Sequence, residues 1–106
     1  METEAVVVAW CTAPDVVFAQ RAARAWVQER LAACVQMLPG LTSVYRWQGA
    51  VHEDSEVLLI IKTVSARVPA LRQWLETHHP YDVPELVVLD AADGLPAYLR
   101  WVVEQT

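Results

Sequence analysis

The chain has 106 residues, and its composition of 55% hydrophobic and 20% charged residues excludes an intrinsically disordered protein. The formal net charge is −5 and the eight basic residues are scattered, which excludes nucleic acid and anionic membranes as partners. The longest apolar run, residues 5–11, is far shorter than the roughly 20 residues of a membrane span. Two cysteines make no disulfide framework. We therefore expect a single domain over residues 1–106 and a soluble, cytoplasmic protein.

The first third of the chain predicts a strand followed by a helix. Residues 5–11 are rich in valine, which is typical of a strand buried on both faces. Thr12 is a suitable N-cap, and Pro14 suits a first helical turn. Apolar residues then recur at helical spacing, which predicts a helix over residues 14–32.

Residues 34–62 predict a long β-hairpin. Two runs that favour strands are separated by Gln48 and Gly49, and the glycine supplies the positive φ angle of a tight turn. Pro39 and Gly40 interrupt the first run, which predicts a bulge and places this strand at the edge of the sheet.

The last third predicts a helix, a strand and a short final helix. Ser65 is a suitable cap for a helix that ends at His79, because Pro80 prevents its continuation. Residues 85–90 predict a strand, and the last helix begins near Asp93.

The resulting element order is βαββαβ plus a C-terminal helix. This order predicts an α+β protein with a ferredoxin-like split β-α-β sandwich. Right-handed crossovers then give an antiparallel sheet in the spatial order fourth, first, third and second strand. In that arrangement Cys11 and the turn at residues 78–81 lie at the same edge.

The predicted hairpin is too long for one compact subunit. An arm of about 13 residues spans over 40 Å at about 3.3 Å per residue, whereas a domain of this size has a radius of gyration of about 13 Å. We expect the hairpin to protrude and its apolar side chains to be covered by another copy of the chain. The alternative is a coiled hairpin that folds back over its own sheet. The expected oligomer contacts are Val44, Tyr45, Trp47 and Val51.

Six short stretches together resemble the CutA family of divalent-cation tolerance proteins. They follow one another in the family's order over nearly the whole chain, and they are VAWCTAPD (8–15), ERLAACV (29–35), LPGLTSVYRWQG (38–49), LIIKT (59–63), HHPYDVPEL (78–86) and YLRW (98–101). The resemblance implies a PII-like homotrimer that binds copper or other divalent metal ions, such as zinc, without catalysis. It also implies that the metal ligands are Cys11, His78 and His79.

The chemistry of these three residues suits copper or zinc, because both metals accept sulfur and nitrogen ligands. Adjacent side chains such as His78 and His79 diverge on a regular helix or strand, so joint ligation requires the turn that Pro80 makes possible. The alternative is structural: Cys11 is a small core residue, and His78 interacts with the helix C-terminus. Cys34 is expected in the core.

Two further features leave the function open. Lys62, the only lysine, indicates either an acidic partner such as Glu85 or a small-anion site between subunits. His52 and the acidic residues that follow it, Glu56 included, are expected on a solvated face of the hairpin. The alternative functions are a PII-like signalling or structural trimer that binds a small anion or a partner protein, and a small cysteine hydrolase that uses Cys11.

Overall fold

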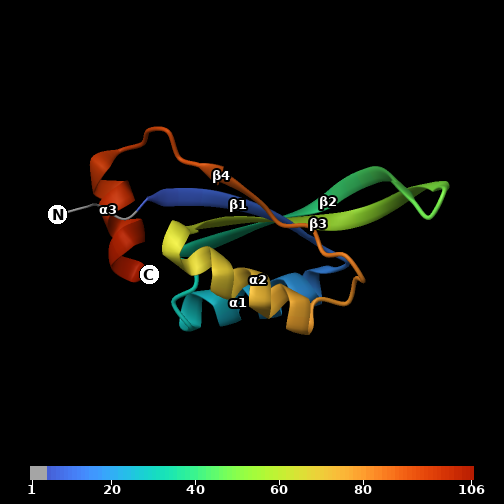
Figure 1. Cartoon of the computed structure of the whole chain (residues 1–106), viewed down its shortest axis with the longest axis horizontal. Helices are drawn as coiled ribbons and strands as arrows, with labels where there is room; N and C mark the ends of the chain where they lie inside the picture. Colours follow the sequence, from blue (N-terminus) through green and yellow to red (C-terminus); the bar gives the residue numbers. More distant parts are fainter. Residues whose placement is uncertain (1–4) are drawn as a thin grey trace.

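The computed structural model describes residues 5–106 and contains one antiparallel sheet with two helices packed on one face (Figure 1). The strand order is β2-β3-β1-β4, which confirms the predicted ferredoxin-like α+β fold. None of the helices in the described part is long and apolar enough to cross a membrane. In chain order the elements are β1 (Val6–Ala13), α1 (Val16–Gln28), β2 (Cys34–Trp47), β3 (Ala50–Val64), the 3-10 turn η1 (Ser65–Arg67), α2 (Val68–His78), β4 (Val87–Asp90) and α3 (Pro96–Gln105).

Helix α1 is shorter than predicted at both ends. Its N-cap is Asp15, whose Oδ1 accepts a 2.8 Å hydrogen bond from the backbone of Phe18. The predicted cap, Thr12, instead extends β1 and pairs with Leu58 of β3. At the other end Arg30 adopts a φ of 59°, and the backbone N–H of Leu31 donates to the carbonyl of the α1 residue five positions earlier. These bonds form a Schellman motif, which ends the helix and turns the chain toward β2.

The hairpin agrees with the sequence in both its turn and its bulge. Gln48 and Gly49 both have positive φ angles, of 50° and 79°, which is the geometry of a type I′ turn. The pairing register shifts between Leu38 and Leu41, and Gly40 between them has a φ of 84°. This bulge lies on β2, which is an edge strand as predicted.

The later elements also begin somewhat differently from the prediction. Helix α2 starts at Val68 after the 3-10 turn, so Ser65 begins that turn and is not the α2 N-cap. The helix ends at His78, and His79 has extended backbone angles, as expected before Pro80. Strand β4 has only four residues, and α3 begins with Pro96 in its first turn.

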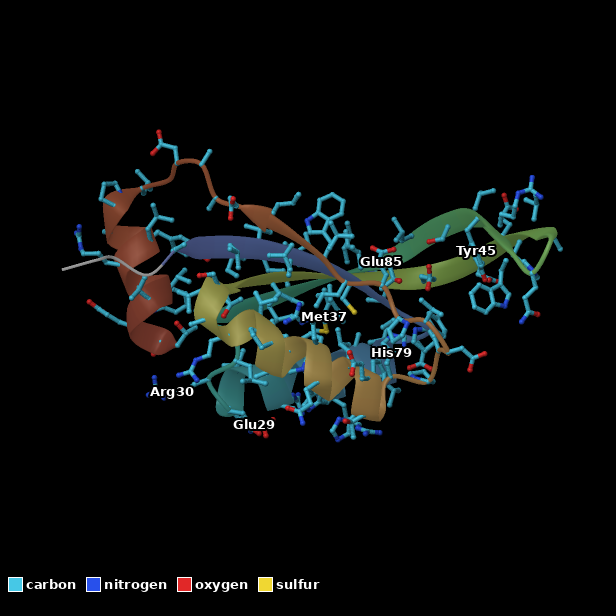
Figure 2. All side chains as sticks on the ribbon, viewed as in Figure 1. Glu29, Arg30, Met37, Tyr45, His79 and Glu85 are labelled. Carbon is cyan, nitrogen blue, oxygen red and sulfur yellow. The ribbon has the colours of Figure 1, made fainter. Side chains whose placement is uncertain are left out.

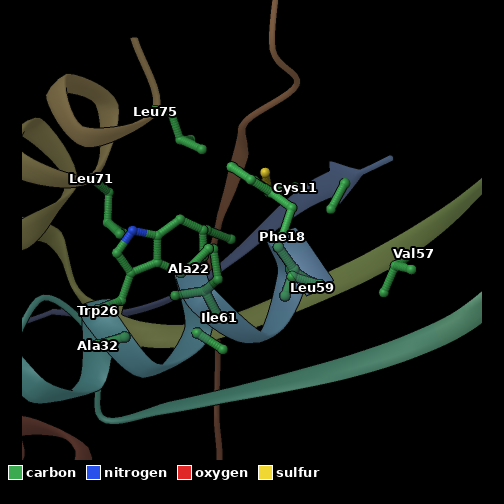
Figure 3. Close-up of a cluster of buried hydrophobic side chains, with 14 residues drawn as sticks. Cys11, Phe18, Ala22, Trp26, Ala32, Val57, Leu59, Ile61, Leu71 and Leu75 are labelled. Carbon is green, nitrogen blue, oxygen red and sulfur yellow. The ribbon is translucent and has the colours of Figure 1, made fainter. Parts of the chain in front are cut away.

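The main core lies between the sheet and the two helices (Figure 3). Small residues of α1 allow a close approach to the sheet, and Trp26 fills the space between α1 and α2. Leu59 and Ile61 of β3 meet this layer from the sheet, with Leu71 above them on α2. Helix α3 packs at the end of the sheet that lies away from the hairpin turn (Figure 1). It does so through a smaller cluster centred on its only buried residue, Val102.

The distal part of the hairpin extends away from this core, so it does not fold back over its own sheet (Figure 1). The molecule measures 49 Å along its longest axis and 25 Å and 23 Å along the others. The two most exposed of the four predicted contact residues are Val44 and Val51, at 63% and 64%. The predicted protrusion is therefore confirmed in the single chain.

Candidate functional site

Cys11 lies in the core and not at a surface. It is fully buried, and Figure 3 shows its side chain among the apolar residues between the sheet and the helices. Burial, followed by the charges of Glu85 and Glu56, raises the pKa of the Cys11 thiol to about 12. The thiolate that a nucleophilic mechanism requires is thus disfavoured. This direction is opposite to the one that a cysteine hydrolase needs.

His79 is held in one tautomer by two hydrogen bonds. The backbone N–H of Tyr81 donates to Nδ1 over 3.1 Å, so Nδ1 carries no proton and Nε2 does. Nε2 donates in turn to the carbonyl oxygen of Thr12 over 2.8 Å. The ring is buried and packs edge-on against Phe18, at 5.0 Å between centroids. Neither nitrogen of His79 has a free lone pair for a metal ion.

His78 has a different environment from its neighbour. Its Nδ1 lies 2.9 Å from the carbonyl oxygen of Trp74, to which it must donate, and its ring stacks on the indole at 4.3 Å. The side chain is exposed, so the lone pair on Nε2 is available. His78 is the one predicted ligand with an accessible donor atom.

The turn at residues 78–81 does lie beside the end of β1, as the hydrogen bond between His79 and Thr12 requires. The three predicted ligands nevertheless do not fit a shared copper or zinc site in this arrangement. Cys11 is buried in the core, His79 uses both nitrogens, and His78 is exposed at the surface. Across residues 5–106 no group of three or more His, Cys, Asp or Glu side chains is placed to hold a metal ion.

A cavity near these residues opens between the hairpin and the segment after α2. It has a volume of about 650 Å³, and its lining includes Tyr45 of β2 and Glu85 of the segment after α2, both labelled in Figure 2. We call it the hairpin cleft. It is lined by Thr12, Ser43, Val44, Tyr45, Trp47, Glu56, Pro80, Tyr81, Asp82, Val83 and Glu85.

A buried carboxylate forms part of the wall of the hairpin cleft. Glu56 is only 8% exposed, and its Oε2 accepts a 2.8 Å hydrogen bond from the hydroxyl of Tyr81. Burial and then this bond raise the pKa of Tyr81, so the phenol stays protonated. On the hairpin side of the cleft the hydroxyl of Tyr45 donates a hydrogen bond to Asp54, and this bond raises the pKa of Tyr45.

The prediction that Glu56 lies on a solvated face was therefore wrong. Glu56 directly precedes the residues of β3 that pair with β1, and Val57 pairs with Ala13 at the end of β1. The segment after α2 then covers its side chain through Tyr81. The only signal in the sequence that Glu56 is buried was the position of Glu56 next to the apolar run that begins at Val57.

The prediction of an acidic partner for Lys62 was also wrong. Its Nζ donates to the side-chain oxygen of Gln36 on β2. In the observed register Lys62 pairs with Cys34, so Gln36 lies diagonally opposite on the same face of the sheet. Glu85 lines the hairpin cleft, away from this pair. Cys34 is half-buried and not fully within the core.

Comparison with known proteins identifies the family. The family of the CutA1 divalent ion tolerance protein matches residues 7–105. The chain belongs to this family. It is 50% identical over 95 residues to the divalent-cation tolerance protein CutA of Thermus thermophilus, covering 90% of this chain and 92% of the relative.

Solved CutA structures share the whole fold. The divalent cation tolerance protein of Thermus thermophilus superposes with a TM-score of 0.93 at 48% identity, over 95% of this chain and 98% of that one. An Archaeoglobus fulgidus relative, described as periplasmic, superposes with a TM-score of 0.91 at 29% identity, over 94% of this chain and 97% of that one. Mouse protein CutA is 48% identical over 92% of this chain but only 55% of its own length. The chain thus spans about half the length of that mammalian CutA protein.

Proposed function

We propose that this protein acts in divalent-cation tolerance as a non-catalytic homotrimer. The observation that carries the proposal is the uncovered apolar surface of the single chain, in a fold that belongs to the CutA family. The helices cover one face of the sheet. On the other face large apolar side chains are exposed, among them Trp10, Leu38, Val87 and Leu89. The protruding hairpin adds Val44 and Val51.

A second and third copy of the chain would remove this surface from water. Large exposed apolar patches are rare on monomeric proteins, and homo-oligomer interfaces are more apolar than ordinary surface. Trp10 and Val87 lie opposite each other on neighbouring strands and form one continuous patch. This arrangement favours self-association through the open face of the sheet and the hairpin.

Light scattering on the purified protein tests the assembly. We expect a mass of three chains for the unmodified protein and a lower mass for the double variant Val44→Asp, Val51→Asp. The matched control is Val17→Asp on α1, which is 72% exposed but lies on the helix layer. A monomeric unmodified protein, or equal loss of assembly in the control, would contradict the proposal.

Metal binding is the second part of the proposal. The set Cys11, His78 and His79 stays a prediction, and in this conformation only His78 offers a donor atom. Copper or zinc would add a positive charge at the surface beside α2, where the exposed imidazole supplies one ligand. Such a change at the surface is one that a partner protein can recognise.

Calorimetric titration of the reduced, metal-free protein with Cu(I), Cu(II) and Zn(II) tests this part. If His78 is the principal ligand, His78→Ala loses binding while Cys11→Ser and His79→Ala retain it. Loss in all three variants, with the assembly intact, would support the full predicted set. Equal binding by the unmodified protein and every variant would contradict both hypotheses, His78 as the principal ligand and the full set of three ligands.

The proposal includes a cytoplasmic location. Both cysteines are unpaired thiols, and reducing compartments preserve unpaired thiols. Cell fractionation with an antibody against the protein tests the location. Recovery with periplasmic markers would contradict it.

A further inference from the structure

From the walls of the hairpin cleft we infer that it binds a small organic cation of the alkylammonium or guanidinium class. The volume of about 650 Å³ lies within the range of roughly 300–1,000 Å³ that is usual for small-molecule sites. The inference goes beyond divalent-cation tolerance, because it concerns a different ligand and residues other than the predicted metal ligands.

The first argument is charge. Three carboxylates line the cleft, from Glu56, Asp82 and Glu85, and none of its lining residues is basic. Glu56 is more than nine-tenths buried, yet its only side-chain partner in the described part of the chain is the neutral hydroxyl of Tyr81. A buried carboxylate without a cation is costly. A cationic ligand would supply the missing charge.

The second argument is the aromatic wall. Tyr45 and Trp47 come from β2, and Tyr81 comes from the segment after α2. The faces of such rings attract ammonium and guanidinium groups, most strongly when water is excluded. Cages of aromatic side chains are a recurring way in which proteins bind organic ammonium groups. Tyr45 and Trp47, predicted from the sequence as oligomer contacts, thus also line a cavity.

A metal ion fits the same walls poorly. A hard divalent ion such as calcium takes six or more oxygen ligands at about 2.3–2.6 Å. Among residues 5–106 no three acidic, histidine or cysteine side chains converge closely enough to hold a metal. The carboxylates are spread over a cavity of about 650 Å³, which suits an extended cation and not a point charge.

The cationic group could come from a free small molecule or from an arginine of a neighbouring subunit in the proposed trimer. Both sources offer the same chemistry to Glu56 and Trp47. Only a free ligand requires the cleft to remain open in the assembled protein. The experiment therefore uses the assembled protein and measures both the binding of the added cation and the mass of the assembly.

The test is calorimetric titration with 1,5-diaminopentane and with butylguanidinium, using neutral 1,5-pentanediol as the matched ligand control. We expect the two cations to bind and the diol not to bind, with affinity that falls as salt is added. Glu56→Gln should weaken binding about tenfold, since the amide still accepts the Tyr81 hydrogen bond without the charge. Trp47→Leu should weaken it about threefold.

Two control variants lie at the other end of the molecule on α3. Glu104→Gln removes an equal charge, and Trp101→Leu removes an indole that is 40% exposed, close to the 38% of Trp47. Neither should change the affinity. Unaltered binding in Glu56→Gln would overturn the inference, as would equal binding of the diol.

The source of the cation is decided by the same samples. Suppose that the unmodified protein binds neither probe and that Glu56→Gln lowers the mass of the assembled protein. A neighbouring subunit then fills the cleft, and the proposal of a free ligand is overturned. If Zn(II) alone binds and requires Glu56, the ligand is a metal ion and the inference is again overturned. Metal titration of His78→Ala is a separate measurement, so a failure of the proposed metal binding is distinguishable from a failure of cation binding in the hairpin cleft.

Discussion

The two halves of β3 differ sharply although they form one continuous strand. From Val57 to Val64 the strand pairs with β1, and from Leu58 to Lys62 also with β2, and most of its side chains are buried. From Ala50 to Ser55 it pairs only with β2, and every residue is exposed. The change occurs where β1 ends. Backbone pairing and exposed cross-strand contacts, such as those of Tyr45 with His52 and Asp54, therefore hold the distal hairpin, whereas the proximal half is stabilised by apolar burial.

Glu56 lies at the junction of the two halves, and this position explains the hairpin cleft. A protruding ribbon leaves an angle between itself and the body of the domain. The segment after α2 passes through that angle and places Tyr81 against Glu56. The proposed cation site thus lies where a strand leaves the core.

The largest expected contrast is between core and hairpin truncations of the same strand. Leu59→Ala should lower the unfolding free energy by about 3 kcal/mol, since a fully buried side chain is lost and a cavity remains. Val51→Ala, at an exposed position, should cost less than about 0.5 kcal/mol. Denaturant unfolding at one fixed subunit concentration measures both, because assembly also contributes to stability. Equal losses would contradict the comparison.

Alkaline pH should act on the core half through Cys11. Because its pKa in the folded chain is about 12, the fold retains a proton that the unfolded chain loses above about pH 8.5. The Cys11 contribution is full below that pH and is lost between about 8.5 and 12, with a slope of up to about 1.4 kcal/mol per pH unit. Unfolding measured across this window should show a steeper slope in Cys34→Ala than in Cys11→Ala, in which only groups such as Tyr81, whose pKa is also raised in the fold, still contribute.

The smallest expected effect is at the tip of the hairpin. A Cβ on Gly49 would meet no atom within 4 Å, so Gly49→Ala tests only the backbone cost of its φ of 79°. We expect a loss of about 1 kcal/mol in the unfolding free energy. Gln48→Gly, at a φ of 50°, should have the opposite sign or no effect. A loss in Gln48→Gly as large as in Gly49→Ala would show that side-chain contacts, not backbone angles, stabilise the turn.

Much of the architecture could be predicted from the sequence because its signals are local. The turn at Gln48 and Gly49, the bulge at Gly40 and the end of α2 before Pro80 each depend on the angles that a few residues prefer. The apolar patterns then gave the element order, and the handedness of crossovers gave the order of strands. Element ends were less well predicted: β1 continues through Thr12 because β3 offers it a partner.

The sequence by itself determined the fold and the protruding hairpin, since short-range preferences and apolar periodicity carry that information, and the resemblance of its motifs pointed to the family. Only the tertiary structure decided what each candidate side chain is able to do. Cys11 keeps its proton because helices bury it, and both ring nitrogens of His79 are occupied, Nε2 donating to Thr12 and Nδ1 accepting from Tyr81. Glu56 becomes a buried carboxylate because a segment 25 residues away covers it. Protonation and burial depend on neighbours distant in sequence, and no local pattern encodes them.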